Sequence, residues 1–482
     1  MFRTDLTEQP SLFAFTVRDL IAEDSDVWLY IDLFDALDLE DFDGDYVSQG
    51  KPGIAPKLML RSLFYGLTHG IVTGRKLADV CCNDSRYIVL SGEQRPDSRT
   101  FQRFLIRHAQ RLDALFVQVV RLAQKMGLVS LGKVALDGSR FKANTSKHKA
   151  MSYGRMNQAL SEIRSDLTRL KEDLARENSS ERTEPESKLE GEIKLREKRL
   201  AKILAAKASL EKEHGEEVPP DSAQKSFHDH DAMPMAKKND AFIYGYNCQA
   251  AVDETSQIIV AADLHDAPND YGATAPMLGE IKANCDKAAE RVLVDSGYRS
   301  NENITTIESS GSTPYVATGK GEAQADDGIE RDVILTKGPD GAATYLCPAG
   351  KKLRGYANKG EGTLSARLPR RACKTCPLAG GCPLLRRGKR IRLPKPEHFV
   401  AVAGNLARMR TPEGKAVYAR RKVIVEPVFG NLKNKGIRIV VRGRGRVRTW
   451  WRVAATAHNI EKIIRSMTAS RQSALLAAAC PG

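Results

Sequence analysis

The stretch Gly132-Lys-Val-Ala-Leu-Asp137-Gly-Ser-Arg140 is a short apolar run that ends in an acid and a glycine. Such a run is typical of a central strand that presents a side chain at its carboxyl end. The stretch Arg291-Val-Leu-Val-Asp295-Ser-Gly-Tyr298-Arg299 repeats this pattern. Two central strands of one sheet can bring their end residues together, so we expect Asp137 and Asp295 to be neighbours.

The residues between these two strands predict the rest of an α/β core. Strand patterns cover residues 242–252 and 257–264, and a turn of four polar residues separates them. Residues 273–285 have the composition of a helix. The order strand, hairpin, helix, strand predicts an α/β fold with a mixed sheet.

A third acid lies in the stretch Tyr418-Ala-Arg-Arg-Lys-Val-Ile-Val-Glu426-Pro-Val-Phe-Gly-Asn-Leu-Lys433. From Arg420 to Arg452 the sequence has eleven Lys or Arg residues, and Glu426 is its only acid. A carboxylate repels the phosphates that such a strip attracts, unless a divalent cation binds both groups. We therefore interpret Glu426 as a metal ligand at a nucleic-acid cleavage site. The alternative is a surface helix in which Glu426 pairs with Arg421.

Asp137, Asp295 and Glu426 together suit magnesium. Mg²⁺ keeps several waters and needs only a few carboxylates, so three acids without histidine suffice. In hydrolysis and transfer of phosphodiesters, one ion activates the attacking hydroxyl and a second ion stabilises the leaving 3′-oxygen. The sequence thus predicts a site for two Mg²⁺ ions. Capping Asp residues are common at strand ends, so each strand-end acid alone is a weak indication.

The charge of the chain favours a polyanionic partner. Lys and Arg outnumber Asp and Glu by 15. The first 50 residues are acidic and the region after Glu413 is strongly basic, which favours a nucleic-acid surface over a generic basic protein or one bound to acidic membrane. The amino terminus lacks a secretory pattern and no apolar run of about 18 residues occurs. We therefore expect a cytoplasmic, nucleoid-associated protein without a membrane partner.

Residues 1–128 predict a helical amino-terminal domain. Apolar spacing indicates helices from Pro56 onward, over 75–81, from Asp97 onward and over 112–126. Basic residues on these helices suit a helix-turn-helix-like module that binds DNA. These residues are Arg75, Lys76, Arg99, Arg103 and Arg107. A plain helical bundle is the alternative.

Two insertions are expected in the rest of the chain. Leu and Ile at spacings of three and four, among many charged residues, predict a hairpin of two antiparallel helices at about residues 150–220. A solvated linker helix is the alternative. Residues 300–415 are rich in Gly, Pro and charge and have little periodicity. Arg alternates with Gly or Val over 436–448, a last helix is predicted over 453–467, and residues 471–482 are expected to be a tail.

Four cysteines of the second insertion are candidate zinc ligands. Cys347, Cys373, Cys376 and Cys382 are separated by 25, 2 and 5 residues. Four thiolates can bind a tetrahedral Zn²⁺, and a structural zinc would supply folding energy in a region poor in periodic apolar residues. Four buried or reactive thiols are the alternative, because only one Cys-x-x-Cys pair is present. We interpret His228-Asp-His-Asp231 as a polar turn without a catalytic role.

The chain resembles, over nearly its whole length, bacterial insertion-sequence transposases of the DDE (Asp-Asp-Glu) type. Leu136-Asp137-Gly-Ser resembles the family's motif around the first acid, and Val294-Asp295-Ser-Gly-Tyr298 resembles the motif around the second. The family's Tyr-Arg-Glu-Lys signature is similar to Tyr418, Arg421, Glu426 and Lys433. Arg421 stands one residue further from Glu426 than is usual in that signature, and Lys422 has the usual spacing.

This resemblance implies a ribonuclease H-like mixed sheet with flanking helices, formed by residues 129–299 and 416–470. It implies that Asp137, Asp295 and Glu426 bind Mg²⁺, that water nicks the end of the element, and that the freed 3′-hydroxyl attacks target DNA. The residues implied in holding DNA are Tyr418, Arg421 and Lys433, with Tyr298 and Arg299 in the same cleft. The partner is double-stranded DNA, at inverted-repeat ends and target, bound by a homodimer. A related nuclease without strand transfer and a non-catalytic DNA-binding regulator are the alternatives.

Overall fold

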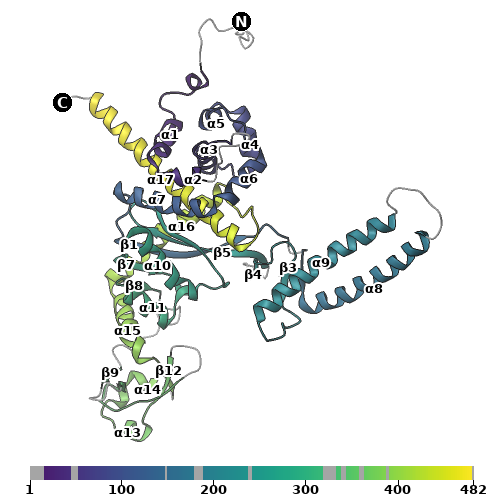
Figure 1. The fold of residues 1–482 in the computed structure, drawn as a ribbon. Coiled ribbons are helices and arrows are strands. Elements are labelled where there is room, and N and C mark those ends of the chain that lie inside the picture. Colours follow the sequence, from purple (N-terminus) through teal and green to yellow (C-terminus); the bar gives the residue numbers. More distant parts are fainter. Residues whose placement is uncertain are drawn as a thin grey trace, which may run out of the picture.

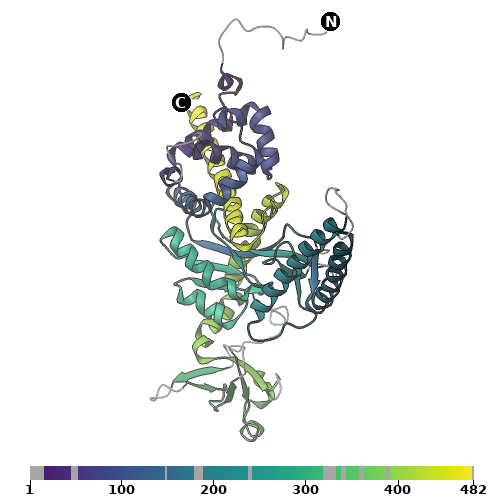
Figure 2. The ribbon, with the colours of Figure 1, turned by 45° about the vertical axis from the view of Figure 1, so that its right-hand side comes forward.

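The computed structural model describes residues 16–44, 53–146, 149–178, 188–236, 242–317, 333–337, 343–357, 363–386 and 390–479. Three parts follow one another along the molecule in Figures 1 and 2: a helical domain, a central sheet with flanking helices, and a small module of short strands. An arm of two helices projects from the side of the central part.

The central sheet is mixed. Its strands in the described part of the chain are β1 (Lys133–Lys142), β4 (Met233–Ala236), β5 (Phe242–Asp253), β6 (Ile259–His265), β7 (Arg291–Val294) and β8 (Thr313–Val316). They neighbour one another in the order β4-β5-β1-β7-β8, and β6 pairs with β5. β1 is antiparallel to β5 and parallel to β7, and β7 is parallel to β8. The predicted α/β fold with a mixed sheet is confirmed.

Helices cover the sheet, which explains the continuous apolar runs of its central strands. Residues 134–136 of β1 and 292–294 of β7 are fully buried. Among the helices that contact its strands, α10 (Thr274–Cys285) packs on β5 and β6, α11 (Asn301–Ser309) on β8, and α16 (Pro412–Asn434) on β1, β5, β7 and β8.

The helical domain draws on both ends of the described chain. Its amino-terminal helices are α1 (Asp26–Ala36), α2 (Glu40–Asp43), α3 (Pro56–Thr68), α4 (Gly74–Asn83), α5 (Ser85–Leu90), α6 (Ser98–Arg107) and α7 (Ala109–Lys125). The long α17 (Arg444–Ala479) packs on α1, α3, α7 and β6. One apolar core therefore joins the helical domain to the sheet.

Helix α17 begins nine residues earlier than the sequence predicted, at Arg444 instead of residue 453. Two acids of the His228–Asp231 run bind the backbone at this helix start. Asp229 Oδ1 accepts a hydrogen bond from Gly443 N at 3.1 Å, and Asp231 Oδ2 accepts one from Arg444 N at 2.7 Å. Carboxylates at a helix amino terminus satisfy free N–H groups and oppose the helix dipole, so these acids have a structural role here.

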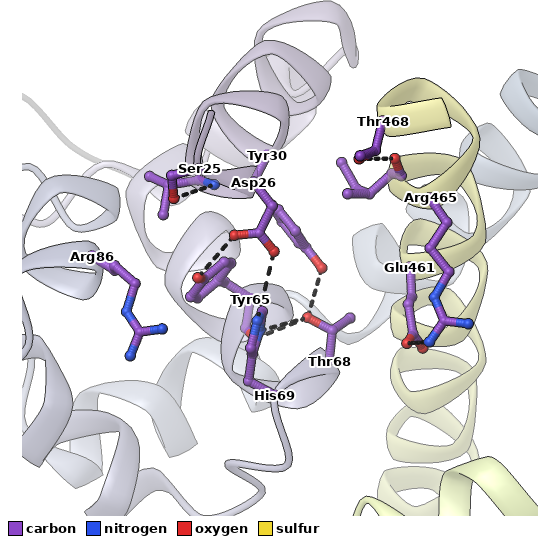
Figure 3. A network of polar contacts seen from close by, with 12 residues as sticks. Ser25, Asp26, Tyr30, Tyr65, Thr68, His69, Arg86, Glu461, Arg465 and Thr468 are labelled. Carbon is purple, nitrogen blue, oxygen red and sulfur yellow. Dashed lines mark hydrogen bonds and ion pairs between the residues drawn. The ribbon is translucent and has the colours of Figure 1, made fainter. Parts of the chain in front are cut away.

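Polar contacts join α1 to α3 inside the helical domain, as Figure 3 shows. The hydroxyls of Tyr30 and Thr68 lie 2.6 Å apart, and Tyr65 donates to Asp26 Oδ1 at 3.1 Å. His69 Nε2 lies 3.6 Å from Asp26 Oδ2. The buried contact between Tyr30 and Thr68 fixes the relative position of the two helices, because the Tyr30 hydroxyl loses its partner if they separate.

The projecting arm has its own core. It consists of α8 (Tyr153–Asn178) and α9 (Lys188–His214), and it joins the body through β2 (Ala150–Ser152), which pairs with β3 (Gln224–Ser226). Apolar residues of the two helices pack on each other away from the main core. Lys171 Nζ lies 2.8 Å from Glu197 Oε1, and Arg196 pairs with Asp166.

The small module contains β9 (Ile334–Lys337), β10 (Ala343–Leu346), β11 (Arg354–Ala357), β12 (Thr363–Arg367), β13 (Arg390–Pro394), α13 (Arg370–Lys374) and α14 (Pro383–Arg386). The following helix, α15 (Pro396–Arg410), returns to the sheet and packs on α11 and β8. The sequence predicted residues 300–415 as one insertion. The structure places α11 and β8 of that range in the central part, because β8 pairs with β7.

Candidate active site

Asp137 and Asp295 occupy adjacent positions on two parallel strands. Leu136 of β1 pairs with Val294 of β7, and each acid is the next residue of its chain. Asp137 Oδ1 accepts a hydrogen bond from Gly138 N at 2.9 Å, and Asp295 Oδ1 accepts one from Gly297 N at 2.8 Å. The parallel pairing therefore brings the two predicted acids side by side at the carboxyl end of β7.

A fourth acid, Asp270, lies beside them and was not singled out from the sequence. A Cβ on Gly138 would lie 2.6 Å from Asp270 Oδ1, and a Cβ on Gly297 would lie 3.2 Å from Asp270 Oδ2. Asp270 Oδ1 accepts hydrogen bonds from Asn247 Nδ2 and Gln249 Nε2, each at 2.8 Å. The glycine that follows each strand-end acid thus leaves room for this carboxylate. In the sequence, these two glycines were the only indication that another group approaches the acids.

Arg421 connects the first acid to the third. Its Nη1 lies 3.1 Å from Asp137 Oδ2, and its Nη2 lies 3.7 Å from Glu426 Oε1. Burial raises the pKa of Asp137 to about 6; Arg421 opposes this rise, and the nearby Asp295 adds to it. The Arg421 side chain is 9% exposed, against 55% for Glu426. The guanidinium is therefore the cation that compensates the half-buried Asp137 carboxylate.

Glu426 is held in place by the middle of α16, where Pro427 interrupts the hydrogen bonds of the helix. Proline has no N–H, so the carbonyl four residues before it loses its helical donor. That carbonyl belongs to Val423, and Gln257 Nε2 donates to it at 2.9 Å. Gln257 also accepts from His458 Nε2 at 2.8 Å through its backbone carbonyl. The turn between β5 and β6 therefore fixes both α16 and α17.

The residues predicted to hold DNA differ in their surroundings. Lys433 Nζ donates to Ser139 Oγ at 2.7 Å, and Ser139 lies two residues beyond Asp137 on β1. Tyr418 is half-buried, and burial raises its pKa. Arg299 follows the turn η4 (Ser296–Tyr298) and is also half-buried.

Tyr298 was expected to line the DNA cleft, and its position does not fit that role. Its side chain is fully buried, and its hydroxyl donates to Gln249 Oε1. The reason is that the η4 turn points the ring into the core below Asp295. Tyr298 therefore supports the turn that carries Asp295.

The basic strip from Arg420 to Arg452 is not a uniform phosphate-binding surface. Its sequence holds one acid, but that acid and acids outside residues 420–452 form ion pairs with five of its cations. The ion pairs are Arg421 with Asp137 and Glu426, Lys435 with Glu461, Arg444 with Asp266, Arg448 with Asp263, and Arg452 with Asp113 and Glu280. These cations attach α16 and α17 to the rest of the fold.

The four cysteines predicted to bind zinc surround one small cavity of about 20 Å³. Cys347 follows β10, Cys373 lies in α13, and Cys376 and Cys382 lie in the loop before α14. Burial raises the pKa of Cys373, and the other three thiols raise it further because they are close. The fold thus gathers the four residues from separate segments.

Within the described ranges, no group of three or more His, Cys, Asp or Glu side chains has the arrangement of a metal site. This holds for the three acids and for the four cysteines. The donor types nevertheless suit the predicted ions, since carboxylate oxygens are ligands for Mg²⁺ and thiolates for Zn²⁺.

Two parts of the chain match the models of transposase domains. Residues 346–464 match the model of the Transposase DDE domain, and residues 16–107 match a Transposase domain (DUF772). The first match includes Glu426 and the Tyr418–Lys433 stretch but neither Asp137 nor Asp295. The second match covers helices α1 to α6. No curated protein and no solved structure matches the chain.

The two matches support a metal-dependent transposase enzyme of the DDE type that cleaves DNA. They agree with the mixed sheet, since DDE domains have a ribonuclease H-like fold. Every helix in the described part of the chain is too short or too polar to cross a membrane.

Proposed function

We propose that this protein cuts DNA at the terminal inverted repeats of an insertion sequence and joins the freed 3′-hydroxyl ends to target DNA. The observation that carries the proposal is the meeting of Asp137, Asp295 and Glu426 around Arg421. The acids come from two strands and a helix that are far apart in the sequence. The transposase matches supply the reaction class.

Asp137, Asp295 and Glu426 would hold Mg²⁺. Bound Mg²⁺ activates the attacking water or hydroxyl and stabilises the leaving oxygen. Asp295 is oriented for this task by its bond to Gly297 N, and Glu426 is positioned by α16. The Asp137 carboxylate must be ionised to act as a ligand, and its contact with Arg421 favours that form.

Arg421 and Lys433 would bind phosphate oxygens next to the cleaved bond. Arg421, which pairs with Asp137 in this structure, would be available to a phosphate if a bound cation neutralised that carboxylate in its place. Lys433 lies on the same face of β1 as Asp137, since its partner Ser139 is two residues along the strand. Charge-assisted hydrogen bonds of this kind hold a phosphodiester in one orientation.

Zn²⁺ in the small module is part of the proposal. Its support is the convergence of Cys347, Cys373, Cys376 and Cys382 on one cavity. Metal analysis of purified protein tests it: we expect about one equivalent of zinc, which is lost when Cys376 is replaced by Ser. Less than about half an equivalent in the unaltered protein would contradict the zinc site.

The catalytic proposal is tested with DNA that carries the flanking inverted repeats, a target plasmid and Mg²⁺. We expect cleaved ends and joined products from the unaltered protein. Asp295→Asn should lower cleavage by at least about 10³-fold and leave DNA binding intact, because asparagine can still accept the Gly297 bond.

Asp286→Asn is the matched control. Asp286 is 76% exposed and has φ +56°, a conformation that asparagine tolerates well. Full activity is expected from this variant. Cleavage within tenfold of normal in Asp295→Asn would reject the assigned site. Cleaved ends without joined product would identify a nuclease, and absence of cleavage would favour a DNA-binding regulator.

A further inference from the structure

Two adjoining cavities lie between the helical domain and the end of β1. Their volumes are about 600 and 650 Å³, and Thr73, Asn144, Val440 and Arg442 line both. One wall is formed by α4 and α6, and the other by the segment that connects α16 to α17. The shared residues make them one continuous surface, which we call the interdomain groove.

The interdomain groove is strongly cationic. Six of its lining residues are Arg75, Lys142, Lys149, Arg438, Arg442 and Arg446, and none of its lining residues is Asp or Glu. The cations come from α4, the end of β1, the segment before the arm, the connection between α16 and α17, and the start of α17. Burial lowers the pKa of His228 in the same groove, and the charges of Arg442 and Lys149 lower it further.

These cations differ from those that hold the fold together. Within the described residues, the side chains of Arg75, Lys142, Lys149, Arg438 and Arg446 are exposed and form no ion pair. Arg442 donates to Asn144 O at 2.9 Å, and Asn144 Nδ2 donates to Val440 O at 2.9 Å. These hydrogen bonds fix the wall of the groove, and its other cationic side chains remain exposed to solvent. A cluster of exposed positive charges without acids indicates a polyanionic ligand.

We propose that the interdomain groove binds the phosphate backbone of duplex DNA that continues from the cleavage site toward the helical domain. This inference rests on the proposed function, since it assigns the path of the substrate. Lys142 lies five residues beyond Asp137 on β1, which corresponds to about 17 Å at roughly 3.3 Å per residue. Duplex DNA rises about 3.4 Å per base pair, so the groove contacts phosphates about five base pairs from the cleaved bond.

Charge spread over five segments favours a duplex over a small anion. A single phosphate or nucleotide is satisfied by two or three cations at one point, whereas a backbone needs cations along a line. Because the groove is built from both domains, DNA lying in it contacts the helical domain and the catalytic domain at once.

The test measures how the affinity for a labelled duplex depends on salt. In the absence of Mg²⁺, binding is followed by fluorescence anisotropy at graded KCl. The triple variant Lys142→Ala/Arg438→Ala/Arg446→Ala should bind more weakly. Its plot of log affinity against log salt should be less steep by about 2.7, since each lost phosphate contact removes about 0.9 from the slope.

A control triple, Arg199→Ala/Lys282→Ala/Lys287→Ala, removes the same charge from exposed residues outside the groove. It should keep the slope of the unaltered protein. Equal slopes for the two triple variants, both shown to be folded by circular dichroism, would contradict DNA binding in the interdomain groove. Phosphate ethylation gives a second readout, with interference expected about five base pairs from the cut in the unaltered protein only.

The outcomes separate this inference from the proposed function. Suppose that the unaltered protein cleaves and joins DNA, but the triple variant in the groove keeps the salt dependence of the unaltered protein. The proposed DNA path through the groove is then wrong, and the proposed function is still supported. If no cleavage occurs with Mg²⁺ yet the slope falls as expected, the groove stands as a DNA-binding surface of a non-catalytic protein.

Discussion

Replacement of Glu280 by Gln is expected to remove a loss of stability that the protein suffers as the pH rises. Glu280 lies on α10, and Arg452 Nη2 of α17 donates to its Oε1 at 2.5 Å. Arg452 Nη1 also lies 3.3 Å from Asp113 Oδ2 of α7, so this arginine links the helical domain to the sheet layer. Burial raises the pKa of Glu280 from its ordinary 4.5 to about 7, against the effect of Arg452.

The sign follows from the raised pKa. Between pH 4.5 and 7 the folded protein keeps the Glu280 proton while the unfolded chain loses it. Stability that this group contributes at low pH is therefore lost as the pH rises through 7. Between about pH 5 and pH 8, this amounts to about 2.5 kcal/mol of unfolding free energy. Glu280→Gln keeps an acceptor for Arg452 but has no proton to lose.

The measurement is guanidinium-induced unfolding at both pH values, followed by tryptophan fluorescence. Trp450 and Trp451 are buried beside Arg452 and report on this part of the core. We expect Glu280→Gln to gain about 2.5 kcal/mol relative to the unaltered protein on going from pH 5 to pH 8. Glu308→Gln, at an exposed position on α11, should show no such gain. A pH-independent difference for Glu280→Gln would refute the reasoning.

Three further changes test the site and its supports. Gly138→Ala should lower stability by about 1–3 kcal/mol and abolish cleavage, because its Cβ would lie 2.4 Å from Gln249 Nε2; Gly279→Ala, with open space around it, should not destabilise. Lys433→Met should slow cleavage about 10–100-fold at saturating DNA, measured in single-turnover assays. Burial lowers the pKa of His458 to about 4. The unfolding free energy should therefore fall by up to about 3 kcal/mol as the pH drops from about 6.5 to 4. In denaturant titrations, His458→Gln should not show this loss of stability at acidic pH.

The strand-end acids could be predicted because their signal is local. An apolar run followed by an acid and a glycine describes β1 and β7 without knowledge of the rest of the chain. The parallel pairing of these two strands then brings Asp137 and Asp295 side by side. Glu426 was also accessible, since one acid among eleven cations is visible in the sequence itself. Their roles as magnesium ligands stay a prediction.

The partners of the basic strip could not be predicted in the same way. Arg444 and Arg448 pair with Asp266 and Asp263, which lie roughly 180 residues earlier, and only the packing of α17 on β6 brings them together. The early start of α17 has a similar origin. Gly443 and Gly445 weaken the local helix signal, and the carboxylates that cap the helix come from a distant segment.

Asp270 shows a third limit. Nothing in the sequence around it distinguishes it from other polar loop residues, whereas Gly138 and Gly297 each lack a Cβ at the point where its carboxylate approaches. Tyr298 failed as a predicted DNA contact for a related reason. The direction of a side chain after a tight turn depends on backbone angles that residue types alone do not set.

The position of α17 has a consequence for synthesis of the protein. Roughly 320 residues separate the end of α7 from the start of α17, and a ribosome adds about 5–20 residues per second. The face of α7 that α17 covers therefore stays uncovered for about 15–60 s in every nascent chain. A chain that stops short of α17 keeps this apolar face uncovered, so the core of the helical domain is complete only when the carboxyl-terminal helix has been made.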